Sequence, residues 1–401
     1  MITMRRQLLG LGFIAASSVL AIHAAQAMSG PTAIQIDGGP LGPLQLSGGV
    51  DGYGYVLNNT PDGSKNEGFN VANGLVELQK TDGELQFTIE VGSNGGAITL
   101  GSNTPAQTTI NNFSTGPLYA GYITIAPTGQ PFTISVGQIA SLEGYESAID
   151  WNNPSQLTTA IFFVQNSQNR GVLGTYTQGP FELQVSFGDG YDTGVFNFVQ
   201  ALATYTFNST NILNVYYAGN EGTTGLNAKT YGGNNGYGNT NGGTVGTFGP
   251  QYANSQMIGA YYSYTKGNLN LIPEVQYQYS KTNAKVNIFK PTSNFGAAVF
   301  ADYTFGTSPY SIGGWVEYFD SHASASDQAA GSGNWFIAPD AEAIGAAVSP
   351  TWQYKDLFAR ANAGYLYLLH NEDANGDTTG FGSNGTNRGQ FIGTLEAGLL
   401  F

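Results

Sequence analysis

The stretch QFIGTLEAGLLF, residues 390–401, ends the chain and alternates in character up to its last residue. Phe391, Leu395 and Phe401 occupy one set of alternate positions, while Glu396 belongs to the other set. Because successive side chains of a β-strand point to opposite faces, the two sets form an apolar face and a more polar face. The stretch therefore predicts an amphipathic final strand with an aromatic residue at its end.

The same alternation recurs along the chain. Phe181, Val185 and Phe187 alternate with Glu182 and Gln184. Comparable segments are 84–92, 269–280 and 310–319. A soluble β-sandwich has the same period of two, but its apolar faces are usually rich in Leu, Ile and Val, and its outer faces in Lys and Arg. Here the polar faces carry Gln, Thr, Asn and Glu, and the strand ends carry aromatic residues, which is typical of strands that cross a membrane in a barrel.

The composition also favours a membrane barrel over a soluble domain. Of the 401 residues, 10% are charged and 13% are aromatic, whereas soluble domains average about 25% charged residues. The many aromatic residues argue against a disordered chain. No segment after the N-terminal region offers the roughly 18 continuous apolar residues of a transmembrane helix. The chain has no cysteine, so an exported protein of this sequence needs another source of stability, which a closed, hydrogen-bonded barrel supplies.

The N-terminal region has the pattern of an export signal. Arg5 and Arg6 precede an apolar stretch at 8–20, and Ala25-Gln26-Ala27 has the small-x-small pattern of a cleavage site. A transmembrane anchor is the alternative interpretation, which the shortness of the apolar stretch disfavours. The predicted parts of the chain are a signal peptide at 1–27, a periplasmic lead-in segment at 28–45 and a transmembrane β-barrel at 46–401.

The connections between the predicted strands fall into short turns and long polar loops. Both ends of such a barrel lie in the periplasm, so the two classes must alternate along the chain. The segment 157–165 breaks this alternation if it is counted as a strand, and we therefore assign it to the loop after the fifth strand, as a short helix. An all-β fold follows, an antiparallel transmembrane barrel of about 16 strands, with 14 or 18 strands as the alternatives. The expected strands are 46–57, 69–80, 84–92, 118–126, 132–139, 170–178, 181–189, 197–207, 211–220, 255–265, 269–280, 294–305, 310–319, 341–354, 357–370 and 389–401.

The loop after the fifth strand has a distinctive sequence. It starts with GQIASLEGYE at 137–146, and Arg170-Gly171-Val172 leads into the next strand. Together with SPTWQY at 349–354, these stretches resemble the β-barrel porins of the OmpL-like group. The resemblance extends in pattern over most of the mature chain. It implies a barrel that passes small hydrophilic solutes, and general porins fold a long loop after the fifth strand into the lumen, where it narrows the pore.

A loop folded inward would bring its charged side chains to the narrowest part of the pore. The expected constriction residues are Glu143, Glu146, Asp150 and Arg170. Rings of acidic groups attract cations, and an opposed basic group sets up a transverse field. The alternative is that these side chains are solvated loop charges at the extracellular mouth.

Further charged side chains lie on the polar faces of the predicted strands. A glutamate that faced lipid at mid-membrane depth would be destabilising, so a position facing the lumen is favoured. The expected lumen-facing residues are Glu77, Glu84, Glu90, Glu182, Glu274, Glu317, Arg360 and Glu396. Because acids outnumber bases in this set and the formal net charge is −14, the pore is predicted to prefer cations.

Signals for catalysis and for metal binding are weak. Ser321 and Ser324 flank His322 only by proximity in the sequence, and a hydrolase needs an orienting acid or amide as well. The stretch 373–384 begins like a calcium loop, but it has threonine instead of glycine at its sixth position and asparagine instead of glutamate at its twelfth. We expect no enzymatic activity, no cofactor and no metal site, and the acidic net charge argues against nucleic acid as a partner.

The sequence thus predicts a porin of a Gram-negative outer membrane. Small hydrophilic solutes and ions would diffuse passively, with a preference for cations, through a water-filled lumen. The alternatives are a substrate-specific channel and a non-transporting barrel that acts as an adhesin or a structural anchor. Phe401 resembles the C-terminal signal that the outer-membrane assembly machinery recognises. The expected partners are the lipid bilayer, the transported solutes, that machinery and, by analogy with general porins, further copies of the chain in a homotrimer.

Overall fold

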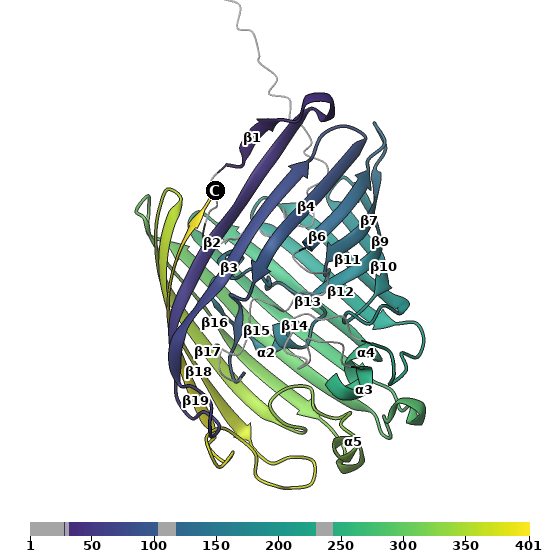
Figure 1. The fold of residues 1–401 in the computed structure, drawn as a ribbon, viewed down its shortest axis with the longest axis vertical. Helices are drawn as coiled ribbons and strands as arrows, with labels where there is room; N and C mark the ends of the chain where they lie inside the picture. The colour runs from purple at the N-terminus through teal and green to yellow at the C-terminus, as the bar shows by residue number, and fades with distance from the viewer. Residues whose placement is uncertain (1–27, 29–31, 103–117, 230–243) are drawn as a thin grey trace, which may run out of the picture.

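A closed ring of antiparallel strands forms the wall of the protein (Figure 1). The computed structural model describes residue 28 and residues 32–102, 118–229 and 244–401, so the predicted signal peptide lies outside the described residues. The main sheet has 17 strands, and all of them except β1 belong to the ring, which closes where β19 pairs with β2. The prediction of a 16-stranded antiparallel barrel is confirmed.

Each observed strand begins and ends within three residues of its predicted range. The strands of the ring are β2 Pro43–Leu57, β3 Glu67–Lys80, β4 Leu85–Asn94, β6 Leu118–Ile125, β7 Phe132–Ala140, β9 Gln168–Gln178, β10 Phe181–Asp189, β11 Phe196–Asn208, β12 Asn211–Asn220, β13 Ser255–Lys266, β14 Leu269–Ser280, β15 Thr292–Thr304, β16 Tyr310–His322, β17 Glu342–Tyr354, β18 Leu357–His370 and β19 Gly389–Leu400.

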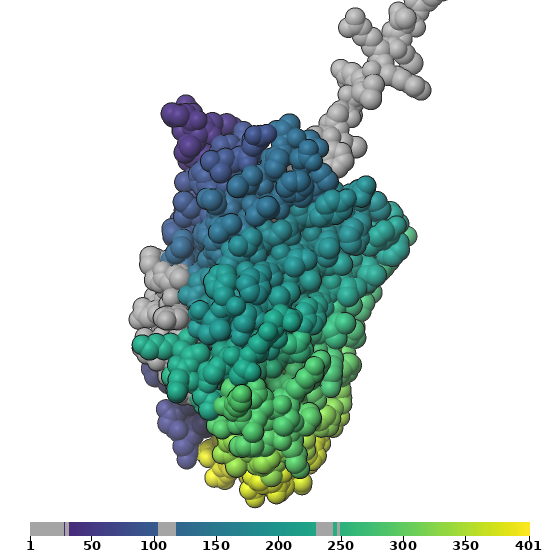
Figure 2. Space-filling view, turned by 90° about the vertical axis from the view of Figure 1, so that its right-hand side faces the viewer, coloured from purple at the N-terminus to yellow at the C-terminus, as the bar shows by residue number. Residues whose placement is uncertain are grey.

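The two faces of the wall differ in the way that the alternation predicts. Apolar side chains such as Phe69, Val185 and Leu395 are exposed on the outside, where 67% of the Leu395 side chain is accessible. Polar side chains such as Gln184 and Gln200 are buried on the other face. Figure 2 shows the middle of the chain as an unbroken outer surface on this side of the barrel. An apolar outer band and a polar inner face suit a barrel that is surrounded by lipid.

The two ends of the ring meet in a seam of backbone hydrogen bonds. In the β19–β2 register, Glu396 pairs with Tyr53 and Leu400 with Gly49. The ladder extends to the last residue, because the Gly48 amide donates to the Phe401 carbonyl at 2.8 Å and the Phe401 amide donates to the Gly48 carbonyl at 2.9 Å. The final strand is thus fully used in closing the wall, as its alternation predicts.

The segment before the ring is partly ordered as a hairpin. Strand β1, Ile34–Asp37, pairs antiparallel with the start of β2, and the short 3-10 helix η1, Gly39–Leu41, connects them. Strand β2 begins at Pro43, three residues before the predicted start of the barrel at residue 46. The end of the predicted lead-in segment is therefore part of the sheet.

A β-bulge in β3 interrupts the alternation beside β2. Asp51 of β2 lies opposite two residues, Ala72 and Asn73, because the register shifts between Val50 and Gly52. Both Ala72 and Asn73 are buried, although neighbours in a regular strand would point to opposite faces. The bulge re-aims the Asn73 side chain toward the inside of the barrel, and bulges often occur beside functional sites.

Two prolines stand inside strands of the ring, where the sequence predicts a bulge or a strand boundary. Pro273 lies in β14 and Pro350 in β17, and neither ends its strand or shifts the register. Each proline instead coincides with a gap in the ladder on one side, between β13 and β14 and between β17 and β18. The missing N–H donor thus removes local pairing without changing the topology.

The long connections carry the short helices. Helices α3 Val245–Phe248, α4 Pro250–Ala253 and α5 Ala325–Ala329 lie at the end of the barrel opposite β1 (Figure 1). Helix α2, Ala160–Phe163, occupies the segment that the alternation of turns excluded from the wall, and the Thr159 hydroxyl caps it by accepting from the Phe162 amide. No helix within the described ranges is long and apolar enough to cross a membrane.

Candidate functional site

The connection between β7 and β9, residues 141–167 and here called the β7–β9 segment, is mostly buried. It contains the 3-10 helix η3, Asp150–Asn152, the short strand β8, Leu157–Thr158, and helix α2. Strand β8 pairs in parallel with β5, Ile98–Thr99, of the connection between β4 and β6. Its contacts are with the polar face of the wall, the same face on which the predicted lumen charges lie.

Glutamates of the wall hold the backbone of this segment. The Glu274 carboxylate on β14 accepts from the Tyr145 amide at 3.3 Å, and the Glu317 carboxylate on β16 accepts from the Ala160 amide at 2.8 Å. The Trp315 indole N–H donates to the Leu157 carbonyl at 2.6 Å. Two of the predicted lumen-facing acids therefore satisfy buried N–H groups that would otherwise lack partners.

A second group of contacts joins the segment to β17, β18 and β19. The Ser349 hydroxyl lies 2.7 Å from the Ser155 hydroxyl and 2.6 Å from the Asn362 side-chain carbonyl, within hydrogen-bond distance of both. The same Asn362 carbonyl accepts from the Gln156 amide, and the Thr394 hydroxyl donates to the Gln156 side-chain carbonyl at 2.6 Å. Buried networks of this kind fix one arrangement when their members are paired.

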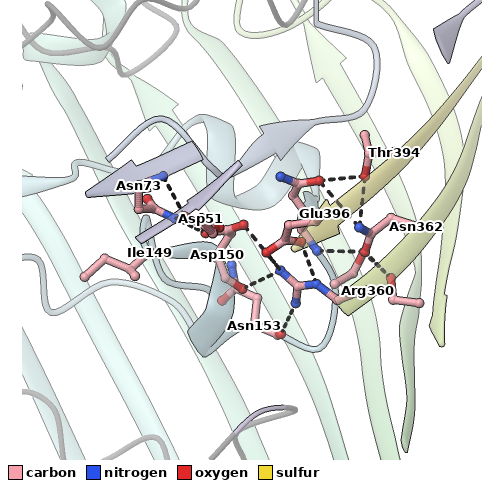
Figure 3. A network of polar contacts seen from close by, with 12 residues as sticks. Asp51, Asn73, Ile149, Asp150, Asn153, Arg360, Asn362, Thr394 and Glu396 are labelled. Carbon is pink, nitrogen blue, oxygen red and sulfur yellow. Dashed lines mark hydrogen bonds and ion pairs between the residues drawn. The ribbon is translucent and has the colours of Figure 1, made fainter. Parts of the chain in front are cut away.

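Arg360 of β18 is the centre of the third group (Figure 3). Its guanidinium donates to both carboxylate oxygens of Glu396 on β19, at 2.9 and 3.2 Å, and pairs with Asp150 of the segment at 3.3 Å. It also donates to the carbonyl of Asn153 at 3.0 Å. None of its side chain is exposed, so the ion pairs are not screened by bulk water. The planar fork of arginine suits this bidentate geometry.

Asp51 of β2 and Asn73 of β3 complete this group. The Asp51 carboxylate accepts from the Asn73 backbone amide at 2.7 Å and from its side-chain amide at 3.0 Å. The same side-chain amide donates to Asp150. One oxygen from each of Asp51, Asp150 and Glu396 lies within 4.8 Å of the others. We call these three acids with Asn73 and Arg360 the seam cluster, since they lie on both sides of the closure between β19 and β2.

The opposite side of the β7–β9 segment borders a cavity. About 880 Å³ of empty space, partly open to solvent, lies between the segment and strands β3, β4 and β6. Glu77 and Glu90 line it from the wall and Glu143 and Glu146 from the segment. Within the part of the chain that the structure describes, no lysine or arginine lines this cavity. Its fixed charge is therefore acidic.

Glu77 and Glu90 are direct cross-strand partners in the β3–β4 register. Like charges placed opposite each other destabilise a sheet. The Ser47 hydroxyl donates to Glu77 at 3.3 Å, which offsets only a part of that repulsion. Two tyrosines, Tyr119 and Tyr122, line the cavity beside these glutamates. The pair is costly for folding, and this makes it a candidate for function.

The acids of the β7–β9 segment are shielded from water. Burial raises the pKa of Glu143 to about 7, although the Asn166 amide and the Gln200 side chain donate to its carboxylate at 2.9 and 2.6 Å. Burial also raises the pKa of Glu146 well above its usual value. The Thr159 hydroxyl and amide donate to Glu146. The charge of the segment therefore changes near neutral pH.

Two predicted site residues lie elsewhere. Arg170 forms an ion pair with Asp189, its cross-strand partner on β10, and shares a strand face with the exposed Val172. β9 begins at Gln168, so Arg170 lies within the wall, and its role in a constriction stays a prediction. Arg360 pairs with Asp150 in its place.

Glu84 is the other exception. It is exposed in the turn before β4, where its carboxylate accepts from the Thr128 amide at 3.1 Å, and its place on the lumen face stays a prediction. Glu182 remains on the polar face of β10, half-buried, and accepts from Thr177 and Gln184. The strand starts one residue later than predicted, so Glu84 precedes it.

Sequence reasoning missed Asp51, Asn73 and Asp302. Asp302 is a buried acid on β15 that accepts from Asn270. Each is a polar residue inside a predicted strand, and that signal was present in the sequence. Asn73 could not be assigned to the inner face, because only the bulge places it there.

The weak catalytic and calcium signals have structural explanations. The His322 ring faces Asp320 and Asp340 at 3.3 and 3.4 Å, whereas the Ser324 hydroxyl donates to Asp327. Asp373 accepts from the backbone amides of residues 375 and 377 at 2.9 and 3.0 Å, so the loop that begins there is an Asx-type turn. These contacts of His322 and Ser324 are with acids, and they are not the Ser–His pair that a serine hydrolase requires.

The fold and the site together define a porin-type β-barrel, a closed 16-stranded ring with an acidic interior cavity. The family model described as "Putative beta-barrel porin-2, OmpL-like" matches residues 43–401, and the chain belongs to this family. The resemblance predicted from the sequence is thereby confirmed.

Solved porin structures have the same fold. The anion-selective porin from Comamonas acidovorans is 11% identical with a TM-score of 0.58, and the match covers 89% of this chain and 99% of that chain. OmpT of Vibrio cholerae, folded in vitro, is 10% identical with a TM-score of 0.55, covering 90% and 98%. Salmonella typhi OmpF in complex with daunomycin is 15% identical with a TM-score of 0.52, covering 92% and 100%. A comparison with curated proteins finds no match.

Proposed function

We propose that the protein is an outer-membrane porin through which small hydrophilic solutes and ions diffuse passively, with a preference for cations. The observation that carries this proposal is the acid-lined cavity between the β7–β9 segment and strands β3, β4 and β6. The family membership and the shared porin fold support the general function. The cation preference rests on the residues of this chain alone.

The proposed path follows the side of the lumen that the segment leaves open. On its other side, the segment is hydrogen-bonded to β14, β16, β18 and β19, which leaves little room for a solute. Solutes would therefore pass between the segment and Glu77 and Glu90. With Glu143 and Glu146 on the opposite side, this is the proposed constriction.

The charge of this path would select for cations. Four carboxylates border the cavity, and the opposed glutamates Glu77 and Glu90 are retained although they repel each other. A low-dielectric wall focuses the field of such groups into the lumen and raises the local concentration of cations. A structural role alone would be better served by an amide pair, so ion attraction explains the two acids.

The test is a planar-bilayer recording of the purified protein in a KCl gradient. We expect a reversal potential with the sign of the potassium equilibrium potential. For the double variant Glu77→Gln, Glu90→Gln we expect a smaller reversal potential. Glu182→Gln is the matched control, since it removes one acid from the polar face outside the cavity lining. A reversal potential that favours chloride would overturn the cation preference. An absence of conductance would favour the non-transporting barrel.

Liposome swelling distinguishes a general pore from a specific channel. Uptake of uncharged sugars that falls smoothly with size supports the general porin, whereas uptake of one preferred solute supports the specific channel. We further propose an outer-membrane location and a homotrimer. One of the similar solved structures is described as the trimer form of OmpT, and light scattering of the detergent-solubilised protein tests the trimer directly.

A further inference from the structure

The seam cluster concentrates negative charge in a closed environment. Asp51, Asp150 and Glu396 contribute three carboxylates, and Arg360 contributes one guanidinium, which leaves a formal charge of −2 when all are ionised. The exposed fraction is 4% for Asp51 and 0% for the other two acids. Buried charge of this size requires compensation by protons or by a cation, because its transfer out of water is strongly unfavourable.

Unpaired oxygens point to a ligand at this cluster. Within the described residues, the second carboxylate oxygen of Asp51 and the side-chain carbonyl of Asn73 are buried without a hydrogen-bond partner. Asn73 is fully buried, and its side-chain amide already contacts both Asp51 and Asp150. Native proteins pair nearly all such atoms, so two orphaned oxygens in one cluster need an explanation.

The backbone around the seam cluster lies close to its side chains. A Cβ atom at Gly96 would lie 2.3 Å from a carboxylate oxygen of Asp150 and 2.6 Å from the Asn73 amide nitrogen, so a larger residue there would displace these two side chains. The bulge in β3 directs Asn73 into the cluster against the normal alternation. Figure 3 shows Asp51 and Asp150 side by side, with Glu396 and Arg360 next to them.

We propose that Asp51, Asp150 and Glu396 bind one divalent cation, toward which the Asn73 side chain rotates its carbonyl oxygen in place of its amide nitrogen, and that calcium is the ion that fits. The donors are oxygens only, which hard cations prefer, and two net negative charges match a divalent ion. One oxygen from each acid lies within 4.8 Å of the others, and donors on opposite sides of a calcium ion are about 4.6–5.2 Å apart, twice its usual bond length. Magnesium requires a smaller and stricter octahedron.

The position gives this cation a defined role. Asp51 belongs to β2, Glu396 to β19 and Asp150 to the β7–β9 segment. One ion would therefore bridge the first strand of the ring, the last strand and the segment that borders the cavity. This inference goes beyond the proposed function, since a porin without a cation here would still conduct.

The test begins with the protein as it is isolated, because a buried ion exchanges slowly. We expect elemental analysis of the purified barrel to find close to one calcium ion per chain. After a chelator has removed this ion, calorimetric titration with calcium should show that one ion binds again. Asp51→Asn should weaken calcium binding by roughly tenfold or more, since the number of carboxylates tunes calcium affinity. Asp302→Asn, which neutralises a buried acid on β15, outside the seam cluster, should bind like the unaltered protein.

The outcomes separate the cation from shared protons. If the folded, unaltered barrel carries no calcium and takes up none at millimolar concentrations, protons compensate the cluster and the proposal is overturned. Unchanged calcium binding in Asp51→Asn would also overturn it, since the ion would then lie elsewhere. If Asp51→Asn fails to insert, the elemental analysis of the unaltered barrel still decides the question, independently of any conductance measurement.

Discussion

Charged residues of the wall lie on both sides of the β7–β9 segment. Those on one side form hydrogen bonds with the segment, and those on the other side line a cavity. On the side that faces β14, β16 and β18, the wall residues Glu274, Glu317 and Arg360 form hydrogen bonds with the segment. Toward β3 and β4, Glu77 and Glu90 face open space. The difference teaches that an acid on the polar face of a barrel has no fixed role. It stabilises a loop where a backbone N–H of that loop reaches it, as at Glu274 and Glu317, and it lines a cavity elsewhere, as at Glu77 and Glu90.

The largest effect is expected on the anchored side, from Arg360→Met. The change leaves Asp150 and Glu396 buried without their guanidinium, and breaking a buried ion pair typically costs about 3–5 kcal/mol. We expect a lower unfolding temperature in detergent and larger, noisier single-channel currents, because the segment loses its attachment to β18. Arg388→Met, in the exposed connection before β19, is the control. Equal stability of the two variants would contradict the anchoring role.

Asn362→Leu tests the same side without changing charge. Its side chain joins Ser349, Gln156 and Thr394, and the substitution leaves these buried groups short of partners. We expect a loss of about 1–3 kcal/mol in the free energy of unfolding, measured by denaturant titration, together with more frequent current fluctuations. An identical substitution at Asn375, in an exposed loop, should leave both measurements unchanged.

On the side that borders the cavity, Glu77→Gln should change ion selectivity and should not lower the stability of the barrel. Removing one of two opposed acids relieves repulsion with Glu90, so the free energy of unfolding should stay the same or rise by up to about 1 kcal/mol. The ratio of potassium to chloride permeability should instead fall, by up to about fivefold if the carboxylate acts on an ion at close range in water. A stability loss comparable to that of Arg360→Met would show that Glu77 also serves as an anchor.

The smallest effect is a dependence on pH through Glu143. Burial raises its pKa to about 7, above the value of about 4.3 in an unfolded chain. The carboxylate is therefore charged above pH 7 and neutral below it, so cation preference should decrease as the pH falls from 8 to 6. Protonation also favours the folded state over this interval. Reversal potentials recorded across the range check the first effect, and Glu143→Gln should flatten the curve.

The wall could be predicted from the sequence because its signals are local. Alternation assigns the faces of a strand such as 181–189, and the order of short and long connections fixes the number of strands. The inward position of Asp51 was not predicted, because both faces of its strand carry apolar side chains. Val50 and Val56 lie on one face and Tyr53 on the other. The pattern therefore assigns no inner face there.

The contacts of the β7–β9 segment could not be predicted, since they join residues far apart in the chain. The partners Asp150 and Arg360 are separated by 210 positions. Arg170 shows the limit from the other direction. The predicted strand 170–178 already contains this residue, and its ion-pair partner is Asp189 on the next strand. The sequence grouped Asp150 with Arg170 in one expected constriction, whereas the ion pair of Asp150 is with Arg360.

The closure between β19 and β2 has a consequence for how the protein must be made. The chain's first and last wall strands are mutual partners, with backbone hydrogen bonds up to Phe401. A polypeptide that stops before residue 389 therefore has two bare strand edges, each a template for aggregation. Only a chain that contains both β2 and β19 can pair these two edges.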